Sequence, residues 1–192
     1  MTDAAVGAAA DRDRYTVSQR AVHWLVALLV LGNLAGGATL WALGFSGLRE
    51  SFGLAVTNAV YTGHKTAGIL LLGLMLVRLG LRWRHGAPAK PASMSTAVWH
   101  LARANHAALY VLLLVMPGLG WAATAAGGFP VQFFAWNLPG LVPENEALAN
   151  TLFTLHGAVG LAILALAAVH VAGALRHRFV LQDGVLRRIA LP

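Results

Sequence analysis

Two histidines, His156 and His170, lie fourteen residues apart in an apolar stretch that has no charged residue between positions 147 and 175. Fourteen residues turn an α-helix through about 1400°, so both imidazoles face nearly the same side, about 21 Å apart along the axis. A bilayer core is about 30 Å thick, which places the two rings in different leaflets. Ionisable side chains at such depth are costly and usually functional. Two imidazoles stacked in this way predict two haems in a line, one near each membrane surface.

The composition indicates an integral membrane protein. Of the 192 residues, 58% are hydrophobic and 11% are charged, and the mean hydropathy is +0.66, whereas soluble domains carry about 25% charged residues. Cysteine is absent, which excludes disulfides, iron–sulfur clusters, thiolate-ligated haem and covalently attached haem. Any haem must therefore be held by histidine or methionine. We interpret the net charge of +7 as the Lys and Arg excess of cytoplasmic loops, with no nucleic acid as a partner.

Four stretches are long and apolar enough to predict transmembrane helices, at approximately residues 21–44, 58–81, 96–123 and 149–175. The loops between them are short, so consecutive helices should run antiparallel. We therefore expect an all-α fold, in which residues 1–192 form a single membrane domain. It is an integral membrane antiparallel four-helix bundle in the lipid bilayer, with haem sites in the bundle interior. The first stretch is expected to remain as an uncleaved signal-anchor.

The distribution of positive residues predicts the orientation of these helices. Lys and Arg gather before the first stretch, between the second and third, and after the fourth, whereas the loop before the fourth carries two glutamates and no Lys or Arg. Both termini are therefore expected to be cytoplasmic. That acidic loop also carries four aromatic residues, namely Phe129, Phe133, Phe134 and Trp136. It is expected along the outer surface, either as an interfacial anchor or over the mouth of the bundle.

The orientation assigns a depth to each histidine inside the spans. His64 and His156 fall at an outer level, whereas His23, His106 and His170 fall at an inner level. A b-type haem needs two axial imidazoles from facing helices, one on each side of its plane. We therefore predict His64 with His156, and His23 with His170, as metal ligands of two haem b groups. His106 stays open as a spare inner ligand, a substrate-pocket residue or a bridge to a haem propionate, and an interhelical hydrogen bond is the alternative for any single histidine.

Two cations inside the predicted spans are candidate cofactor-binding residues. Arg78 lies on the same helical face as His64 but at the inner level. There it either snorkels to the cytoplasm or pairs with a haem propionate. Lys65 serves the outer haem, presents positive charge to a substrate, or snorkels. The three remaining histidines of the chain lie among arginines or at helix ends and are expected to be solvated: His85, His100 and His177.

Several segments, taken in their order and spacing, resemble the bacterial cytochrome b561 family, which includes the cytochrome b subunits of nickel–iron hydrogenases. These segments are RYTVSQRAVHWLVALLV, GHKTAGILLLGLMLVRLGLR, HAALYVLLLVMPGLG, FFAWNLPG, LHGAVGLAILALAAVHVAGALRHRF and DGVLRRI, and they span approximately residues 15–191. The resemblance implies haem ligation by His23, His64, His156 and His170, a quinone as redox partner, and residence in the bacterial inner membrane as a multi-pass protein.

Short stand-alone members of this family are most similar to the chain, and one of them is described as a superoxide oxidase. The resemblance therefore implies an oxidoreductase of the superoxide:ubiquinone type, which takes an electron from superoxide and passes it through two haems to ubiquinone. It leaves the electron donor and the direction of flow open. The quinone pocket is also open, with the region of Arg103, Asn105 and His106 as one candidate and the aromatic outer loop as another.

Two other functions remain as alternatives. The chain could be the membrane anchor and electron-conduit cytochrome b subunit of a dehydrogenase or hydrogenase, which requires a periplasmic or membrane redox partner. It could also be a histidine-lined transporter without haem. Cation pathways in membranes usually carry Asp or Glu, and all seven acidic residues of this chain lie outside the predicted spans. The absence of acidic residues from the predicted spans therefore disfavours a transporter.

Overall fold

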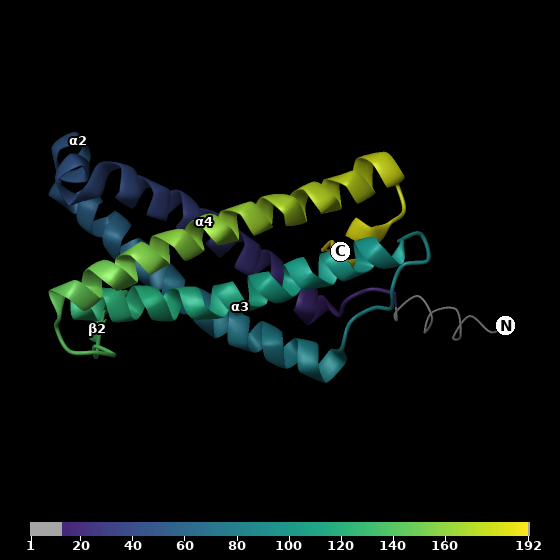
Figure 1. Ribbon diagram of the computed structural model, residues 1–192, viewed down its shortest axis with the longest axis horizontal. Helices are drawn as coiled ribbons and strands as arrows, with labels where there is room; N and C mark the ends of the chain where they lie inside the picture. Colours follow the sequence, from purple (N-terminus) through teal and green to yellow (C-terminus); the bar gives the residue numbers. More distant parts are fainter. Residues whose placement is uncertain (1–12, 192) are drawn as a thin grey trace.

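The computed structural model describes residues 13–191, most of which are helical (Figure 1). The elements follow in the order α2 (Val17–His85), α3 (Thr96–Ala126), β1 (Val131–Phe133), β2 (Trp136–Leu138), α4 (Glu146–Arg176), the π-helix η1 (His177–Leu181) and the 3-10 helix η2 (Val185–Arg188). Helices α2, α3 and α4 are each long and apolar enough to cross a membrane. The described residues therefore have the character of an all-α membrane protein.

Helix α2 reverses its direction near its middle. Its backbone leaves helical geometry at Gly44 (φ 60°, ψ −172°) and at Gly53 (φ 80°, ψ 167°). Residues with a Cβ atom rarely adopt such angles, so glycine is needed at both positions. The segment between them, residues 45–52, is helical, where the sequence predicts a loop. A short helical segment between two glycines thus makes the turn.

The reversal divides α2 into a first arm, residues 17–43, and a second arm, residues 54–85. The arms lie side by side and antiparallel, because the Gln19 side chain near the start of the first donates to the carbonyl of Leu81 near the end of the second, at 3.4 Å. In Figure 1 the arms meet at the end that carries the α2 label. The single long helix therefore contributes two rods to the molecule.

Local hydrogen bonds explain where each long helix begins. Thr16 and Gln19 form a capping box at the start of α2, in which each side chain bonds the backbone N–H of the other. Ser95 accepts a hydrogen bond from the third residue of α3, and Asn145 does the same at the start of α4. These side chains satisfy N–H groups that have no partner inside the helix. The helix starts are therefore encoded by residues next to them in the chain.

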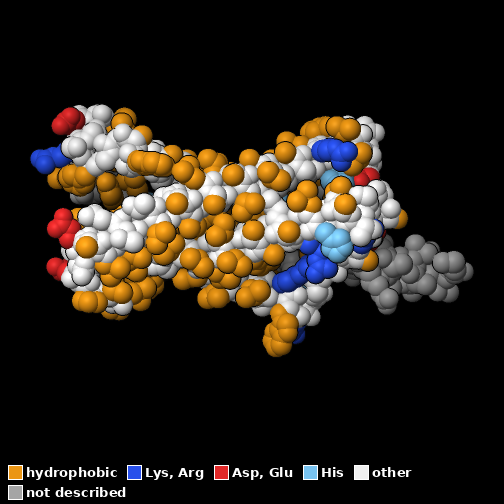
Figure 2. All heavy atoms as spheres, viewed as in Figure 1, with side chains coloured by type: hydrophobic (Ala, Val, Ile, Leu, Met, Phe, Trp, Pro, Cys, Tyr) orange, Lys and Arg blue, Asp and Glu red, His pale blue; other side chains and the backbone are white. Residues whose placement is uncertain are grey.

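The helices pack in a chain of neighbours. Helix α4 packs along α3, and α3 packs against α2, whereas α2 and α4 have almost no close backbone contact. A small buried core joins both arms of α2 with α3 and α4, and its members are Val26, Val30, Leu71, Met75, Leu113 and Ile163. Figure 2 shows hydrophobic side chains over the middle of the molecule and charged side chains at its two ends. This distribution is typical of helices that face lipid.

A β-hairpin closes one end of the molecule. Strands β1 and β2 pair antiparallel, and side chains of the second arm of α2 hold them. Thr62 and Lys65 both donate to the side-chain oxygen of Gln132, at 3.1 and 2.6 Å. Thr66 accepts from the backbone N–H of Phe134 at 2.9 Å. We call this the hairpin end, and the hairpin is the form that the aromatic loop takes.

The residues after α4 fold back onto the start of α2 and close the other end, which we call the tail end. Arg20 donates to the carbonyl of Ala190 at 2.8 Å, and Trp24 donates to the carbonyl of Ile189 at 2.9 Å. These carbonyls lie just after the last 3-10 turn, where backbone acceptors lack helical partners. The first arm of α2 thus anchors the C-terminal residues.

His177 corrects a sequence-based expectation. The sequence predicts that it is solvated, but it is 8% exposed and its Nδ1 lies 2.7 Å from Oδ2 of Asp183. Ser93 and the backbone N–H of Val185 also donate to this carboxylate. Burial acts to raise the pKa of Asp183, but the hydrogen bonds outweigh it and hold the pKa below its ordinary value. The carboxylate thereby joins the C-terminal residues to the linker before α3.

The reversal of α2 can be tested at its glycines. The Gly53→Ala variant should lose about 1–3 kcal/mol of unfolding free energy, because its backbone angles are open essentially to glycine alone. Gly47→Ala is the matched control, since its Cβ would meet only the Cβ of Leu43 at 3.4 Å inside the helical segment. That control should be neutral or slightly stabilising. Thermal unfolding in detergent measures both, and equal melting of the two variants would contradict this account of the turn.

Candidate functional site

Four histidines meet in two pairs across the space between α2 and α4. The ring centroids of His64 and His156 lie 6.1 Å apart, and those of His23 and His170 lie 6.2 Å apart. The second arm of α2 supplies His64, the first arm supplies His23, and α4 supplies both partners. We call the first two the hairpin pair and the second two the tail pair. The structure thus brings together the same histidines that the sequence pairs by depth.

The separation within each pair suits an iron ion between two imidazoles. A metal lies about 2.0 Å from an imidazole nitrogen, so two rings that share one metal have centroids roughly 6 Å apart. Among residues 13–191 no group of three or more His, Cys, Asp or Glu could hold a metal ion. Two protein ligands suffice for a haem iron, because the porphyrin supplies the other four. The pairs therefore fit haem better than a free metal ion.

Glycines on neighbouring helices make room for the rings of the hairpin pair. A Cβ atom added at Gly120 would lie 2.9 Å from Cε1 of His156, and one added at Gly37 would lie 3.2 Å from Cε1 of His64. The first distance is shorter than side-chain contacts allow, and the second is tight. The position of each ring thus depends on the missing Cβ of a facing residue.

The Nδ1 atoms of the hairpin pair are buried and have no hydrogen-bond partner of good geometry in the described part of the chain. The backbone of Asn33 faces His64, and the backbone of Met116 faces His156. When a histidine binds a metal through Nε2, its Nδ1–H usually donates to a backbone carbonyl or carboxylate. Both rings therefore have a candidate partner for the arrangement that metal ligation requires.

Arg78 engages the tail pair directly. Its Nη1 lies 2.7 Å from Nδ1 of His23, and its Nε donates to the hydroxyl of Tyr110 at 2.8 Å. Arginine is always protonated, so this Nδ1 accepts the hydrogen bond. A histidine bound to metal through Nε2 carries its proton on Nδ1, and the two donors would then face each other. Metal ligation by His23 thus requires Arg78 to turn to another acceptor.

His106 lies beside the tail pair. Its ring centroid is 4.9 Å from that of His170, which is less than an intervening iron requires. Its Nδ1 is 2.7 Å from the carbonyl oxygen of Ala102, so Nδ1 carries the proton and Nε2 is the acceptor nitrogen. The side chain is exposed at the protein surface. This geometry favours the interpretation of His106 as a pocket residue that exchanges a proton or forms a hydrogen bond.

Two more side chains belong to the site, namely Lys65 and Tyr110. The ammonium of Lys65 donates to the carbonyl of Pro130 at 2.9 Å as well as to Gln132, so it contacts the hairpin. Tyr110 was not singled out by the sequence analysis, although it lies four residues after His106 on the same helical face. That spacing, opposite the half-buried Arg78 of a facing helix, is the signal that could have indicated it.

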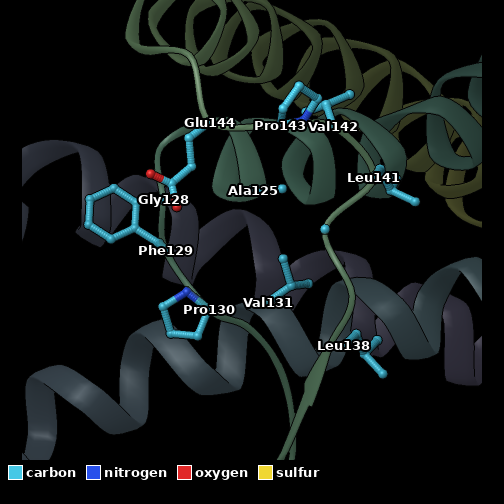
Figure 3. A pocket seen from close by; sticks show the side chains of 11 residues that line it. Ala125, Gly128, Phe129, Pro130, Val131, Leu138, Leu141, Val142, Pro143 and Glu144 are labelled. Carbon is cyan, nitrogen blue, oxygen red and sulfur yellow. The ribbon is translucent and has the colours of Figure 1, made fainter.

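Two hollows lie near the hairpin end. The larger, of about 800 Å³, lies under the hairpin, where Figure 3 shows the Glu144 side chain beside Gly128 and Phe129. No histidine lines it. The smaller, of about 270 Å³, lies between the two arms of α2 and includes His64 and Asn33. Only the smaller hollow therefore reaches one of the histidine pairs.

Comparisons with known proteins identify a family and several relatives. A family model described as prokaryotic cytochrome b561 matches residues 14–190. "Cytochrome b561 homolog 2" of Escherichia coli (strain K12) is 31% identical, over 92% of this chain and 91% of that protein. "Cytochrome b562" of Cereibacter sphaeroides is 31% identical, over 93% and 96%. "Probable superoxide oxidase CybB" of Yersinia pestis is 27% identical, over 92% and 95%.

The role of Gly120 gives a test of the hairpin pair. Gly120→Ala should displace the His156 ring and lower the haem content, because the new Cβ would lie 2.9 Å from that ring. Gly118→Ala, at a glycine with nothing within 4 Å of its added Cβ, is the control and should keep the haem. The Soret absorbance per protein measures the content. Equal absorbance of the two variants would show that His156 does not hold haem in this position.

Proposed function

This chain belongs to the prokaryotic cytochrome b561 family, and we propose that it is a di-haem b-type membrane cytochrome that moves electrons between a small reductant and membrane quinone. Members of this family bind haem b and transfer electrons in membranes. One observation carries the proposal for two haems. The rings of the hairpin pair lie 6.1 Å apart and those of the tail pair 6.2 Å apart, as two imidazoles on one iron would be.

The proposed architecture has four membrane crossings. The two arms of α2, with α3 and α4, make an antiparallel four-helix bundle, and the histidines would hold each haem inside it, between α4 and one arm of α2. The near absence of close backbone contact between α2 and α4 supports this position. Arginines gather at the tail end, so that end faces the cytoplasm in the bacterial inner membrane, and the hairpin end faces outward.

The proposed chemistry is one-electron transfer, which haem iron supplies when bound. His64 and His156 would hold one haem, and His23 and His170 the other. Because two histidines would hold each haem, neither site would have a place for O₂ to bind, so the histidines favour electron transfer over oxygen chemistry. Arg78, released from His23 by ligation, would donate to a haem propionate.

The tail end is the proposed place of quinone. Reduction of a quinone to a quinol takes two electrons and two protons, so its site needs a group that exchanges protons. His106 is exposed beside the tail pair and presents an acceptor nitrogen. Asn105, its neighbour, donates to the carbonyl of Leu166 and keeps a buried side-chain oxygen without a partner in the described part of the chain. Together with Arg103, these residues offer polar contacts for a quinone head group.

Superoxide is the proposed reductant at the hairpin end. Each superoxide ion loses one electron and becomes O₂. Its negative charge would be attracted by Lys65, whose ammonium contacts two neutral oxygens and no carboxylate in residues 13–191, and by Arg49. The relative from Yersinia pestis that is named a probable superoxide oxidase supports this choice of reductant.

A second candidate is the electron-conduit subunit of a dehydrogenase or hydrogenase. It is favoured by the exposed aromatic side chains of the hairpin, Phe134 at 58% and Trp136 at 68% exposure, which would suit a partner surface as well as a membrane interface. A soluble redox subunit that co-purifies in equal amount with this chain would support this candidate.

The number of haems is tested by composition and spectra. Purified protein should contain two haem b per chain. His156→Ala and His170→Ala should each lose one haem and a different spectral component, because each removes one axial ligand from one pair. Pyridine haemochrome assays and reduced-minus-oxidised spectra measure this. A ratio of one, or loss of the same component from both variants, would contradict the two-site assignment.

The reductant and acceptor are tested separately. Superoxide generated enzymatically should reduce the haems of the purified protein, and added ubiquinone should reoxidise them. The superoxide rate should fall as salt increases, because screening weakens the attraction of an anion to Lys65. Stopped-flow spectroscopy measures both steps. If superoxide reduces the haems no faster than in the presence of superoxide dismutase, superoxide is not the donor.

A further inference from the structure

One arginine at the tail end is buried without an anionic partner. Arg20 is 7% exposed, and it forms no ion pair with a carboxylate in residues 13–191. Its Nη1 donates to the carbonyl of Ala190 at 2.8 Å. Its Nε is buried and has no hydrogen-bond partner among the described residues. The guanidinium therefore has one neutral acceptor and an unsatisfied donor.

This arrangement is energetically incomplete. Removing a charge from water is costly even after local relaxation, and an unsatisfied buried donor adds to that cost. One neutral carbonyl offsets only part of it. Buried cations are ordinarily paired with an anion that also accepts their hydrogen bonds. The position of Arg20 thus points to a carboxylate or phosphate that belongs to a bound molecule.

Arg20 lies next to the tail pair. It precedes His23 by three residues, which is less than one turn of helix. Trp24 contacts both the tail pair and the C-terminal residues. Its ring lies 5.4 Å from the His23 ring, and its Nε1 donates to the carbonyl of Ile189. Arg20 therefore lies within one helical turn of His23, and its guanidinium contacts the C-terminal residues at this end.

We propose that Arg20 binds a carboxylate of the cofactor at the tail pair, namely one propionate of its haem. The inference rests on the proposed second haem. Arg78, which would donate to a propionate once His23 is ligated, is the partner of the other carboxylate. The two guanidiniums would balance the negative charges of the two propionates of the tail haem. Arg20 acts as a positioning residue that also sets the midpoint potential of this haem.

The chain offers a matched control for this role. Arg14 also donates to the carbonyl of Ala190, at 3.1 Å, but it is exposed. If Arg20 only anchors the C-terminal residues, then removal of either arginine should have a similar effect. If Arg20 binds a propionate, only the Arg20 variant should change the haem.

The first measurement is potentiometric, on the purified holoprotein. Arg20→Met should lower the midpoint potential of the spectral component that His170→Ala abolishes, because removal of a nearby positive charge favours ferric iron. That potential should also become more dependent on pH, since the unpaired propionate then takes up a proton more readily. Arg14→Met should leave both properties unchanged. Equal shifts in the two variants, or none in Arg20→Met, would overturn the assignment.

The second measurement identifies the anion. The full chain, produced without haem, is reconstituted with haem or with haem dimethyl ester, which lacks both negative charges. Wild type should prefer haem to the ester at the tail site, and Arg20→Met should reduce that preference roughly tenfold, as expected for a charge-assisted hydrogen bond. If Arg20→Met weakens both forms equally, the anion is a lipid phosphate or another group, and the propionate assignment is wrong.

Two further measurements apply if Arg20→Met does not accumulate. Arg20→Lys retains the charge with a different donor geometry and should give an intermediate potential. Wild type that binds haem and its ester equally at the tail site would overturn the proposal without any variant. A protein with one haem per chain would instead contradict the proposed function, so the two failures are distinguishable.

Discussion

The facing of imidazoles across the space between α2 and α4 is the constraint on which the rest of the structure depends. Helix α4 contributes His156 and His170 from one face, fourteen residues apart. Their partners must come from two antiparallel segments, and the reversal of α2 at Gly44 provides these. Helix α3 packs against both α2 and α4, so it holds them together without closing the space between them.

The two ends of the molecule support the histidine levels in different ways. At the hairpin end, neutral oxygens of the hairpin hold Lys65 next to His64. At the tail end, Arg20 and Trp24 hold the C-terminal residues next to His23. One end thus holds a half-buried cation, and the other holds a buried cation. This asymmetry would suit the proposed function, in which electrons enter at the hairpin end and leave near the tail end.

Several features of the site follow from residues that are neighbours in the chain, and others do not. The shared face of His156 and His170 depends only on helical periodicity. The contact between Arg78 and His23, at 2.7 Å, joins residues on different arms of α2, and periodicity says nothing about such a contact. His177 was misjudged for the same reason, because its burial depends on Asp183 and on a π-helical turn that local charge does not reveal.

The sequence by itself indicated a membrane protein and its family, and it predicted a depth for each histidine. Hydropathy, charge distribution and helical spacing are local properties, and in a membrane they predict which segments cross the bilayer and how these segments are oriented. Only the tertiary structure decided the separation of the rings, the helical turn between Gly44 and Gly53, and the buried state of Arg20. These depend on how distant segments pack, since a side chain's environment is set by the helices around it rather than by its neighbours in sequence.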